Sequence, residues 1–115
     1  EYIEEFFFFF LLKPVKCAKT GIYADIQCNS GKNKLLLRAV IVSLPITEES
    51  AVEFCSKNPG FMHACGHDFH TTCLLYAAKV INENKKQHKR SFNRRYGGIV
   101  HCIYPAGDNS FYKLV

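Results

Sequence analysis

The sequence predicts an α/β fold, in which a partial mixed sheet carries an N-terminal hairpin and a strand-helix-strand crossover. The sheet is predicted because apolar and β-branched residues fill segments 21–27, 34–42 and 99–105. The helix is predicted because apolar side chains recur at helical spacing after residue 68. Strands that alternate with a helix along the chain are typical of α/β proteins.

The first half of the chain predicts a short helix and a hairpin. Residues 1–8 have weak helical character, and Pro14 ends it because proline disfavours the helical conformation in the residue before it. The turn-forming stretch "CNSGKN" separates segments 21–27 and 34–42, so we expect these two strands to pair as an antiparallel hairpin. The second strand is apolar almost throughout, which is typical of a strand buried on both faces.

The second half predicts a loop, a helix and a parallel strand. Pro45 and Pro59 bracket a long loop over residues 43–60, and Asp68 is the expected N-cap of the helix that follows. The expected buried stripe of this helix consists of Leu74, Leu75, Ala78 and Ile81. The basic run 85–95 is expected to end this helix, because cations interact favourably with the negative end of the helix dipole. The strand at 99–105 then completes a right-handed crossover, with the site loop at the carboxyl end of a central strand.

Composition and charge favour one folded domain and exclude several classes of protein. The chain has 115 residues, of which 48% are hydrophobic and 22% charged, the balance of a globular protein. The net charge of +5 comes largely from the run 85–95, which no nucleic-acid motif surrounds, so we expect no nucleic acid as partner. The apolar run 6–12 is too short to span a bilayer. We therefore expect no membrane partner and a cytoplasmic location, with self-association if apolar surface is exposed.

The six cysteines favour reduced thiols over a disulfide framework. Their spacing contains no Cys-x-x-Cys, and no signal peptide places the chain in an oxidising compartment. Cys65 and His67 are separated by one residue within "GFMHACGHDFHTT", residues 60–72, so both side chains can face one point in a turn. A thiolate and an imidazole are ligands of zinc and other transition metals. The pair alone is a weak signal, and a buried cysteine beside a surface histidine is the competing interpretation.

Longer motifs resemble a known family. The stretch "MHACGHDFHTTCLLYAAKVI" is similar to the signature M-H-A-C-G-H-D-G-H-T followed by an L-L-G-A-A helix. In the same order along the chain, "KTGIYADI" resembles the family's early strand, "LLLRAVIVSLPITEES" resembles L-R-A-D-M-D-A-L-P-I-x-E, and "FNRRYGGIVHCIYPAGD" resembles F-N-G-T-V-x-x-I-F-Q-P-A-E-E. These motifs belong to the amidohydrolase branch of the aminoacylase-like metallopeptidases, which includes N-acyl-amino-acid amidohydrolases, hippurate hydrolases and auxin-conjugate hydrolases.

The resemblance implies an incomplete catalytic domain of a di-metal hydrolase. It covers residues 17–108 of a single partial domain, 1–115, and leaves 1–16 poorly matched and the tail 109–115 unmatched. The implied substrate is a small N-acyl amino acid, whose amide bond is hydrolysed with zinc or manganese, two ions in the intact family site. Family members are several hundred residues long, and the chain looks like a truncated copy.

The resemblance also implies roles for individual residues. Cys65 and His67 fall on metal ligands, while His63 and His70 would contact substrate or orient the ligands. Asp68 matches the signature as a candidate catalytic or orienting carboxylate, and helix N-cap is its equally weighted alternative. For His63, the alternative that it is simply a histidine on a surface loop is at least as well supported as a role in the site.

The sequence departs from the family pattern where carboxylates are needed. Val40 and Val42 stand in place of the two aspartates of D-M-D, and valine cannot bind a metal. In place of P-A-E-E the chain has "PAGD": Gly107 occupies the general-base position without a side chain, and Asp108 is a further candidate ligand with shorter reach. We therefore expect weak or no activity from this chain alone. Two alternatives are a non-catalytic metal-binding or partner-binding module and a degenerate, non-functional fragment.

Overall fold

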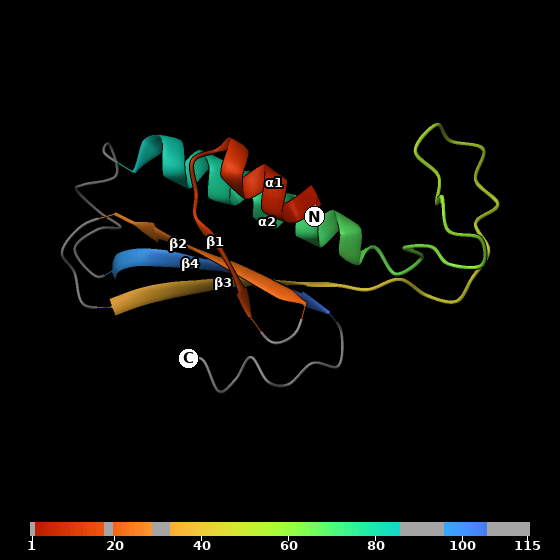
Figure 1. The fold of residues 1–115 in the computed structure, drawn as a ribbon, viewed down its shortest axis with the longest axis horizontal. Helices are drawn as coiled ribbons and strands as arrows, with labels where there is room; N and C mark the ends of the chain where they lie inside the picture. The colour runs from red at the N-terminus through yellow and green to blue at the C-terminus, as the bar shows by residue number, and fades with distance from the viewer. Residues whose placement is uncertain (1, 18–19, 29–32, 86–95, 106–115) are drawn as a thin grey trace.

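The structure is a computed structural model that describes residues 2–17, 20–28, 33–85 and 96–105. A sheet with the strand order β1-β2-β4-β3 forms one layer, and two helices form the other (Figure 1). The elements, in chain order, are α1 (Tyr2–Phe9), β1 (Pro14–Cys17), β2 (Gly21–Gln27), β3 (Asn33–Ile41), α2 (His67–Asn84) and β4 (Tyr96–Pro105). The predicted α/β class and the mixed sheet are confirmed.

The strand-helix-strand crossover is present as predicted. Strands β3 and β4 pair in parallel from Asn33 opposite Tyr96 to Ile41 opposite Pro105, and α2 connects them. Parallel neighbours need such a connection, because the chain must return to the same end of the sheet before the second strand begins. The carboxyl ends of β3 and β4 therefore lie at the same edge of the sheet, where the loop into α2 begins.

The predicted hairpin between residues 21–27 and 34–42 is wrong. The N-terminal hairpin is formed by β1 and β2, which pair antiparallel with Val15 opposite Tyr23. Strand β4 lies between β2 and β3, antiparallel to the first and parallel to the second. A turn between two strands in the sequence does not decide their pairing when a third strand can hydrogen-bond to both.

The prediction that residues 34–42 form a central strand buried on both faces is also wrong. Within the described residues β3 is an edge strand, and only Ala39 on it is buried. Leu37 and Ile41 pack against the main core, whereas Leu36 and Val40 belong to a smaller group on the other face. Both faces thus carry apolar side chains, as the sequence indicates, but the described part of the chain covers them incompletely.

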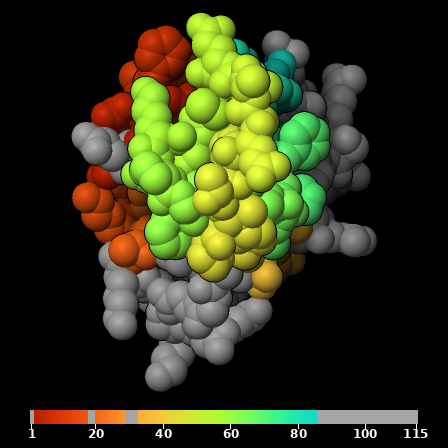
Figure 2. Space-filling model, turned by 90° about the vertical axis from the view of Figure 1, so that its right-hand side faces the viewer, coloured from red at the N-terminus to blue at the C-terminus, as the bar shows by residue number. Residues whose placement is uncertain are grey.

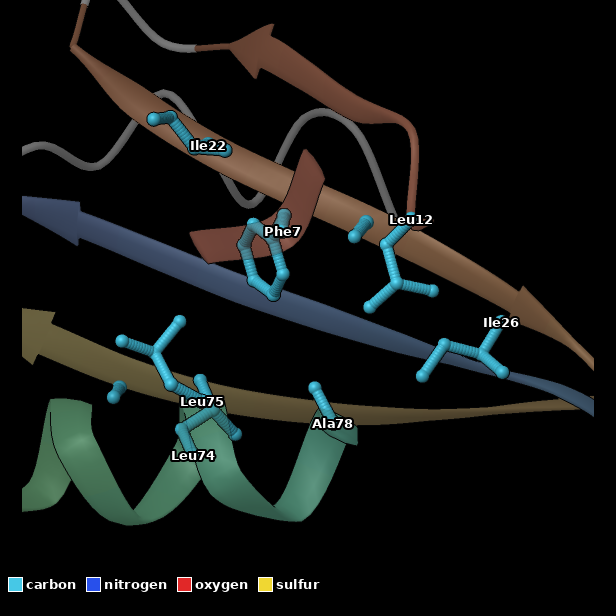
Figure 3. Close-up of a cluster of buried hydrophobic side chains, with 9 residues drawn as sticks. Phe7, Leu12, Ile22, Ile26, Leu74, Leu75 and Ala78 are labelled. Atoms are coloured by element: carbon cyan, nitrogen blue, oxygen red, sulfur yellow. The ribbon is translucent and has the colours of Figure 1, made fainter. Parts of the chain in front are cut away.

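One hydrophobic core lies between the sheet and the helices (Figure 3). Phe7 of α1 is fully buried, and Leu74, Leu75 and Ala78 of α2 pack against the same group. The sheet contributes Ile22, Ala24, Ile26 and Ala39, and Leu12 comes from the segment between α1 and β1. Ile81 is half-buried against this core. The helical stripe predicted for α2 is therefore confirmed.

Helix α1 buries only part of its phenylalanine run. Phe7 has no exposed surface, whereas Phe8 is 58% and Phe9 81% exposed, because neighbouring residues of a helix point in different directions. Leu11, which follows the helix, is 91% exposed and adopts a positive φ of 56°. Neither helix in the described ranges is long and apolar enough to cross a membrane.

The start of α2 differs from the prediction. The N-cap is Gly66, with a left-handed φ of 75°, and no side chain caps the helix. The predicted N-cap, Asp68, lies inside the first turn instead. A carboxylate in this turn still interacts favourably with the positive end of the helix dipole. Glycine precedes the helix because it adopts the left-handed conformation with little steric strain.

Candidate metal site and adjoining pocket

The candidate site lies where an extended loop returns to the N-terminus of α2. We call residues 43–63 the arm. It leaves the end of β3 and projects away from the sheet and helices (Figure 1). An isolated antiparallel bridge closes it: the Leu44 N–H donates to the Met62 carbonyl at 2.8 Å, and the Met62 N–H donates back at 3.1 Å. The bridge brings the candidate ligands beside the end of β3.

The Val42 main-chain carbonyl contacts the last residue of the arm and the loop that follows it. Nδ1 of His63 lies 2.6 Å from this oxygen and donates to it, because a carbonyl can only accept. Nε2 is therefore the acceptor nitrogen of a neutral His63 ring. The Cys65 Sγ lies 3.9 Å from the same oxygen, a weak second contact. Val42 makes both contacts through its main-chain oxygen. They therefore remain possible although Val42 stands where the family pattern has an aspartate.

Cys65 and His67 are brought together as the sequence predicts. Their Sγ and Nδ1 atoms lie 2.8 Å apart, at hydrogen-bond distance. Cys65 is exposed, so the alternative of a buried cysteine beside a surface histidine is wrong for this chain. The pair lies at the entry to α2, where the left-handed Gly66 between them turns the backbone into the helix.

The two atoms of the pair lie closer together than two ligands of one metal ion do. Two ligands of one tetrahedral zinc, at about 2.3 Å for sulfur and 2.0–2.1 Å for nitrogen, lie roughly 3.5 Å apart. The observed 2.8 Å is shorter, and rotation of exposed side chains would open it. In the described ranges no group of three or more His, Cys, Asp or Glu residues is placed to hold a metal. The pair therefore fits a metal as two of its ligands, and the described residues do not complete a dinuclear site.

The other predicted residues occupy different positions. His70 lies one turn along α2, with its ring centroid 5.9 Å from that of His67, and Asp68 lines the neighbouring pocket. The Val40 carbonyl is 3.5 Å from the hydroxyl of Thr71, which is buried on α2 and donates to it. Gly107 and Asp108 lie outside the described residues. The structure thus brings Cys65 and His67 into contact, and the roles of all the predicted site residues stay predictions.

A pocket of about 730 Å³ lies between the arm and the start of α2. It is lined by Ser43, Glu48, Phe54, Ser56, Lys57, Asn58, Pro59, Phe61, Met62, His63 and Asp68. In Figure 2 the arm faces the viewer as the yellow and light-green surface beside the green start of α2. Of these residues only His63 and Asp68 were predicted as site residues. The others were missed because the arm has no periodicity, although its Ser, Asn and Pro residues indicate a structured turn.

Hydrogen bonds within the arm shape the pocket. Glu48 accepts from the Ser50 hydroxyl and from the Ser56 N–H, the latter at 2.6 Å. These donors, the Ser50 hydroxyl first and the Ser56 N–H second, hold the pKa of the Glu48 carboxyl below its ordinary value. The Asn58 N–H donates to Ser56 Oγ at 3.2 Å. Glu48 is therefore the centre of a local hydrogen-bond network in the arm.

Four cysteines of the described ranges, Cys28, Cys55, Cys65 and Cys73, are free thiols. Cys55, Cys65 and Cys73 are exposed, and Cys17 and Cys28 are half-buried. Burial raises the pKa of the Cys28 thiol, with a smaller raising contribution from Asp25 and an opposing one from Lys85. Of the five cysteines whose burial the structure describes, only two are semi-buried, fewer than predicted.

The fold and the site together define a class of protein: part of an α/β domain with a Cys-x-His pair at a helix N-terminus. Residues 37–96, just over half of the chain, match the sequence profile of Peptidase family M20/M25/M40. The chain belongs to this family, in its amidohydrolase and N-acyl-amino-acid deacetylase branch.

Individual relatives agree with this assignment. The chain is 51% identical over 67 residues to an N-acetyl-L-cysteine deacetylase of Bacillus subtilis, a match covering 58% of this chain and 16% of that protein. It is 46% identical over 65 residues to an N-acyl-L-amino acid amidohydrolase of Geobacillus stearothermophilus, covering 56% of this chain and 18% of that protein. The matched region thus spans less than a fifth of either relative.

A solved structure supports the fold over nearly the whole chain. The Bacillus subtilis YXEP protein, described as a dinuclear metal-binding peptidase of the M20 family, superposes with a TM-score of 0.78 and 31% sequence identity. The match covers 91% of this chain and 28% of that protein. The α/β arrangement is therefore that of part of an M20 catalytic domain.

Proposed function

We propose that this chain is part of a metal-dependent amidohydrolase that removes the acyl group from N-acyl amino acids. The observation that carries the proposal is the contact between Cys65 and His67, 2.8 Å apart at the entry to α2. Family membership and the names of the matched relatives supply the reaction class. A thiol and an imidazole are both ligand types suited to zinc, which supports the proposal.

The described residues account for binding and orientation. A divalent metal, zinc or manganese, polarises the scissile carbonyl and lowers the pKa of a bound water when it is present. Cys65 and His67 would hold it, and the hydrogen bond from His63 to the Val42 carbonyl fixes the loop that presents them. Further ligands would come from residues outside the described ranges, among which Asp108 is the candidate in this chain.

Turnover by this chain alone is expected to be weak or absent. Val40 and Val42 contribute main-chain carbonyls to hydrogen bonds, and their side chains can neither ligate a metal nor move a proton. Gly107 supplies no side chain at the position of the general base. The described residues therefore support metal binding. Catalysis needs further groups that these positions do not provide.

The test is the metal content of the purified chain. Native mass spectrometry with zinc or manganese supplied is expected to show bound metal in the natural chain and a loss in Cys65→Ala. Cys55→Ala is the matched control, because Cys55 is an exposed thiol of the arm and is not the cysteine paired with His67. Release of free amino acid from N-acyl amino acids is then measured on the metal-loaded protein. The assignment of Cys65 as a ligand would be overturned if all three proteins bound the same amount of metal, or if none of them bound any.

A second candidate function is a non-catalytic metal-binding module. The observation that favours it is the same: a ligand pair is present, while Val40, Val42 and Gly107 replace carboxylates of the family pattern. Bound metal that depends on Cys65, combined with no hydrolysis above the Cys65→Ala level, would support this candidate over the hydrolase.

A further inference from the structure

We propose that the aromatic face of α1 binds a small organic cation with a quaternary ammonium group, in a pocket formed by four aromatic rings and one carboxylate. The lining residues are Tyr2, Glu5, Phe6, Phe9 and Phe10. The pocket has a volume of about 330 Å³ and shares no lining residue with the larger pocket beside the arm. It is therefore a second site, independent of the candidate metal site and of the proposed hydrolase function.

The rings of this pocket stand at steep angles to one another. The centroids of Phe6 and Phe10 are 4.8 Å apart with an interplanar angle of 54°, and those of Phe9 and Phe10 are 5.0 Å apart at 81°. Rings set in this way form the walls of a corner and not a flat stack. A cation in the corner can therefore lie within about 6 Å of more than one ring centroid, the range at which aromatic faces attract positive charge.

Part of the pocket wall is fixed by the fold, and part is open to a ligand. Phe6 packs against the main core, and the side-chain amide of Asn82 on α2 donates a hydrogen bond of 2.9 Å to the Phe10 carbonyl. In contrast, Tyr2 is 75% and Phe9 81% exposed. The fold thus holds the inner rings in place, while the outer rings present their surface to solvent.

The charge of α1 favours a cation over a neutral ligand. The helix carries two carboxylates, Glu4 and Glu5, and no basic residue, although the whole chain has a net charge of +5. Glu4 is paired with Lys16 at 3.3 Å. Glu5 lines the pocket, and within the described ranges it takes part in no ion pair. A carboxylate beside aromatic rings adds its own attraction for positive charge to that of the ring faces.

A lysine of the chain already uses one of these rings in the same way. The Lys79 Nζ lies 5.0 Å from the centroid of Phe10 and 5.8 Å from that of Tyr76. Phe10 therefore holds a cation at the range expected for a cation–π contact. Lys79 is not among the residues that line the pocket, so its ammonium group leaves the pocket open to a ligand.

The apolar lining favours a quaternary ammonium group over a primary one. A primary ammonium has three N–H donors, and a wall of four rings and one carboxylate would leave some of them without an acceptor. A quaternary ammonium has no N–H donor, and its methyl groups gain free energy from contact with the rings. Aromatic cages in proteins recognise such cations for this reason.

The experiment compares choline with 3,3-dimethylbutan-1-ol, a neutral alcohol of the same shape in which carbon replaces the charged nitrogen. Dissociation constants for the full chain are measured by ligand-observed NMR. Because exposed apolar surface also favours self-association, one protein concentration is used at which sedimentation shows the same species in every variant. The natural chain is expected to bind choline about tenfold more tightly, since each ring at an exposed site contributes a factor of roughly two to five. Equal affinity for the two ligands, or no detectable binding of choline, would overturn the proposal.

Two matched pairs of variants locate the site. Glu5→Gln is expected to weaken choline binding about threefold. Glu4→Gln removes the same charge from the neighbouring residue, which is paired with Lys16 outside the pocket, and should have little effect.

Phe9→Ala is expected to weaken choline binding several-fold, because it removes one ring of the corner. Phe8→Ala removes a ring that is 58% exposed on the same helix but does not line the pocket, and it should leave binding unchanged. Circular dichroism should show that all four variants are folded. The same loss in Glu4→Gln as in Glu5→Gln, or in Phe8→Ala as in Phe9→Ala, would show that choline does not bind in this pocket.

Discussion

Nδ1 of His63 donates a hydrogen bond of 2.6 Å to the main-chain carbonyl of Val42, and this bond joins the end of β3 to the loop that carries Cys65. The bond spans the whole arm, so the geometry of the candidate ligands depends on a backbone atom that lies 21 residues before His63 in the sequence. A substitution at His63 therefore tests whether this contact positions the metal ligands.

His63→Ala is expected to weaken zinc binding by about tenfold, since loss of a group that orients a ligand loop typically has an effect of this size. Cys65→Ala should weaken it further, because it removes a ligand. Competition with a chromogenic zinc chelator measures both affinities, and circular dichroism checks that α2 remains folded. If zinc affinity in His63→Ala equals that of the natural chain, the bond to Val42 does not position the site.

Gly66→Ala is expected to destabilise the protein by about 1–2 kcal/mol, because Gly66 has a φ of 75°, where a side chain is strained. The space around it is open, so the effect comes from the backbone and involves no steric clash with a neighbour. Urea unfolding followed by helical circular dichroism measures the change. Gly66→Asn should be milder, since asparagine tolerates this conformation.

Gly60→Ala is the matched control for this prediction. Gly60 has a similar φ of 78° with nothing near its added methyl group, but it lies in the arm and not at a helix start. Its substitution should loosen the arm and change the unfolding of α2 less than Gly66→Ala does. Equal loss of helix stability in the two variants would argue against a special role of Gly66 as the N-cap.

Phe7→Ala is expected to lower the free energy of unfolding by about 3–5 kcal/mol, because it removes a fully buried aromatic side chain from the core. Phe9→Ala changes the same residue type in the same helix where the ring is 81% exposed, and it should alter stability by less than about 0.5 kcal/mol. Chemical denaturation of both variants checks the pair. Similar losses for the two would mean that α1 does not pack on the sheet as described.

The exposed apolar surface of α1 predicts self-association. Phe8, Phe9 and Leu11 are all more than half exposed, and contiguous apolar surface promotes association in water. The double variant Phe9→Ser with Leu11→Ser should shift the chain toward monomer in analytical ultracentrifugation. An unchanged distribution of species would show that another surface drives association.

Acid is expected to loosen the arm before α2 unfolds. The Ser50 hydroxyl and the Ser56 N–H hold the pKa of Glu48 below its ordinary value of 4.5, so the ionised carboxyl stabilises the folded arm. That contribution is fully present above pH 4.5 and is lost as the pH falls through the lowered pKa. Exchange of the Ser56 amide hydrogen between pH 6 and pH 3, corrected for intrinsic exchange, measures it.

Glu48→Gln is expected to remove most of this pH dependence, because its side chain does not ionise. Glu49→Gln is the neighbouring control and should retain it. A Ser56 amide whose protection is equally pH-dependent in Glu48→Gln would show that a different group controls the arm.

Much of the local structure and part of the site could be predicted from the sequence. The stripe of α2 and the proximity of Cys65 to His67 both depend on residues close together in the chain. The spacing of apolar residues fixes which face of a helix is buried, and a single intervening residue keeps two ligands within reach. These features follow from short-range geometry, which is why the sequence determined them.

The tertiary structure decided which strands are neighbours and what surrounds the ligand pair. Strand β4 separates β2 from β3, Gly66 takes the N-cap position expected for Asp68, and the Val42 carbonyl holds His63. The pocket walls come from an arm without periodicity. Apart from the N-cap, which follows from the left-handed backbone at Gly66, each of these features joins backbone groups or side chains that are far apart in the sequence. Their pairing depends on competition among hydrogen-bond partners and on packing, which local patterns do not encode.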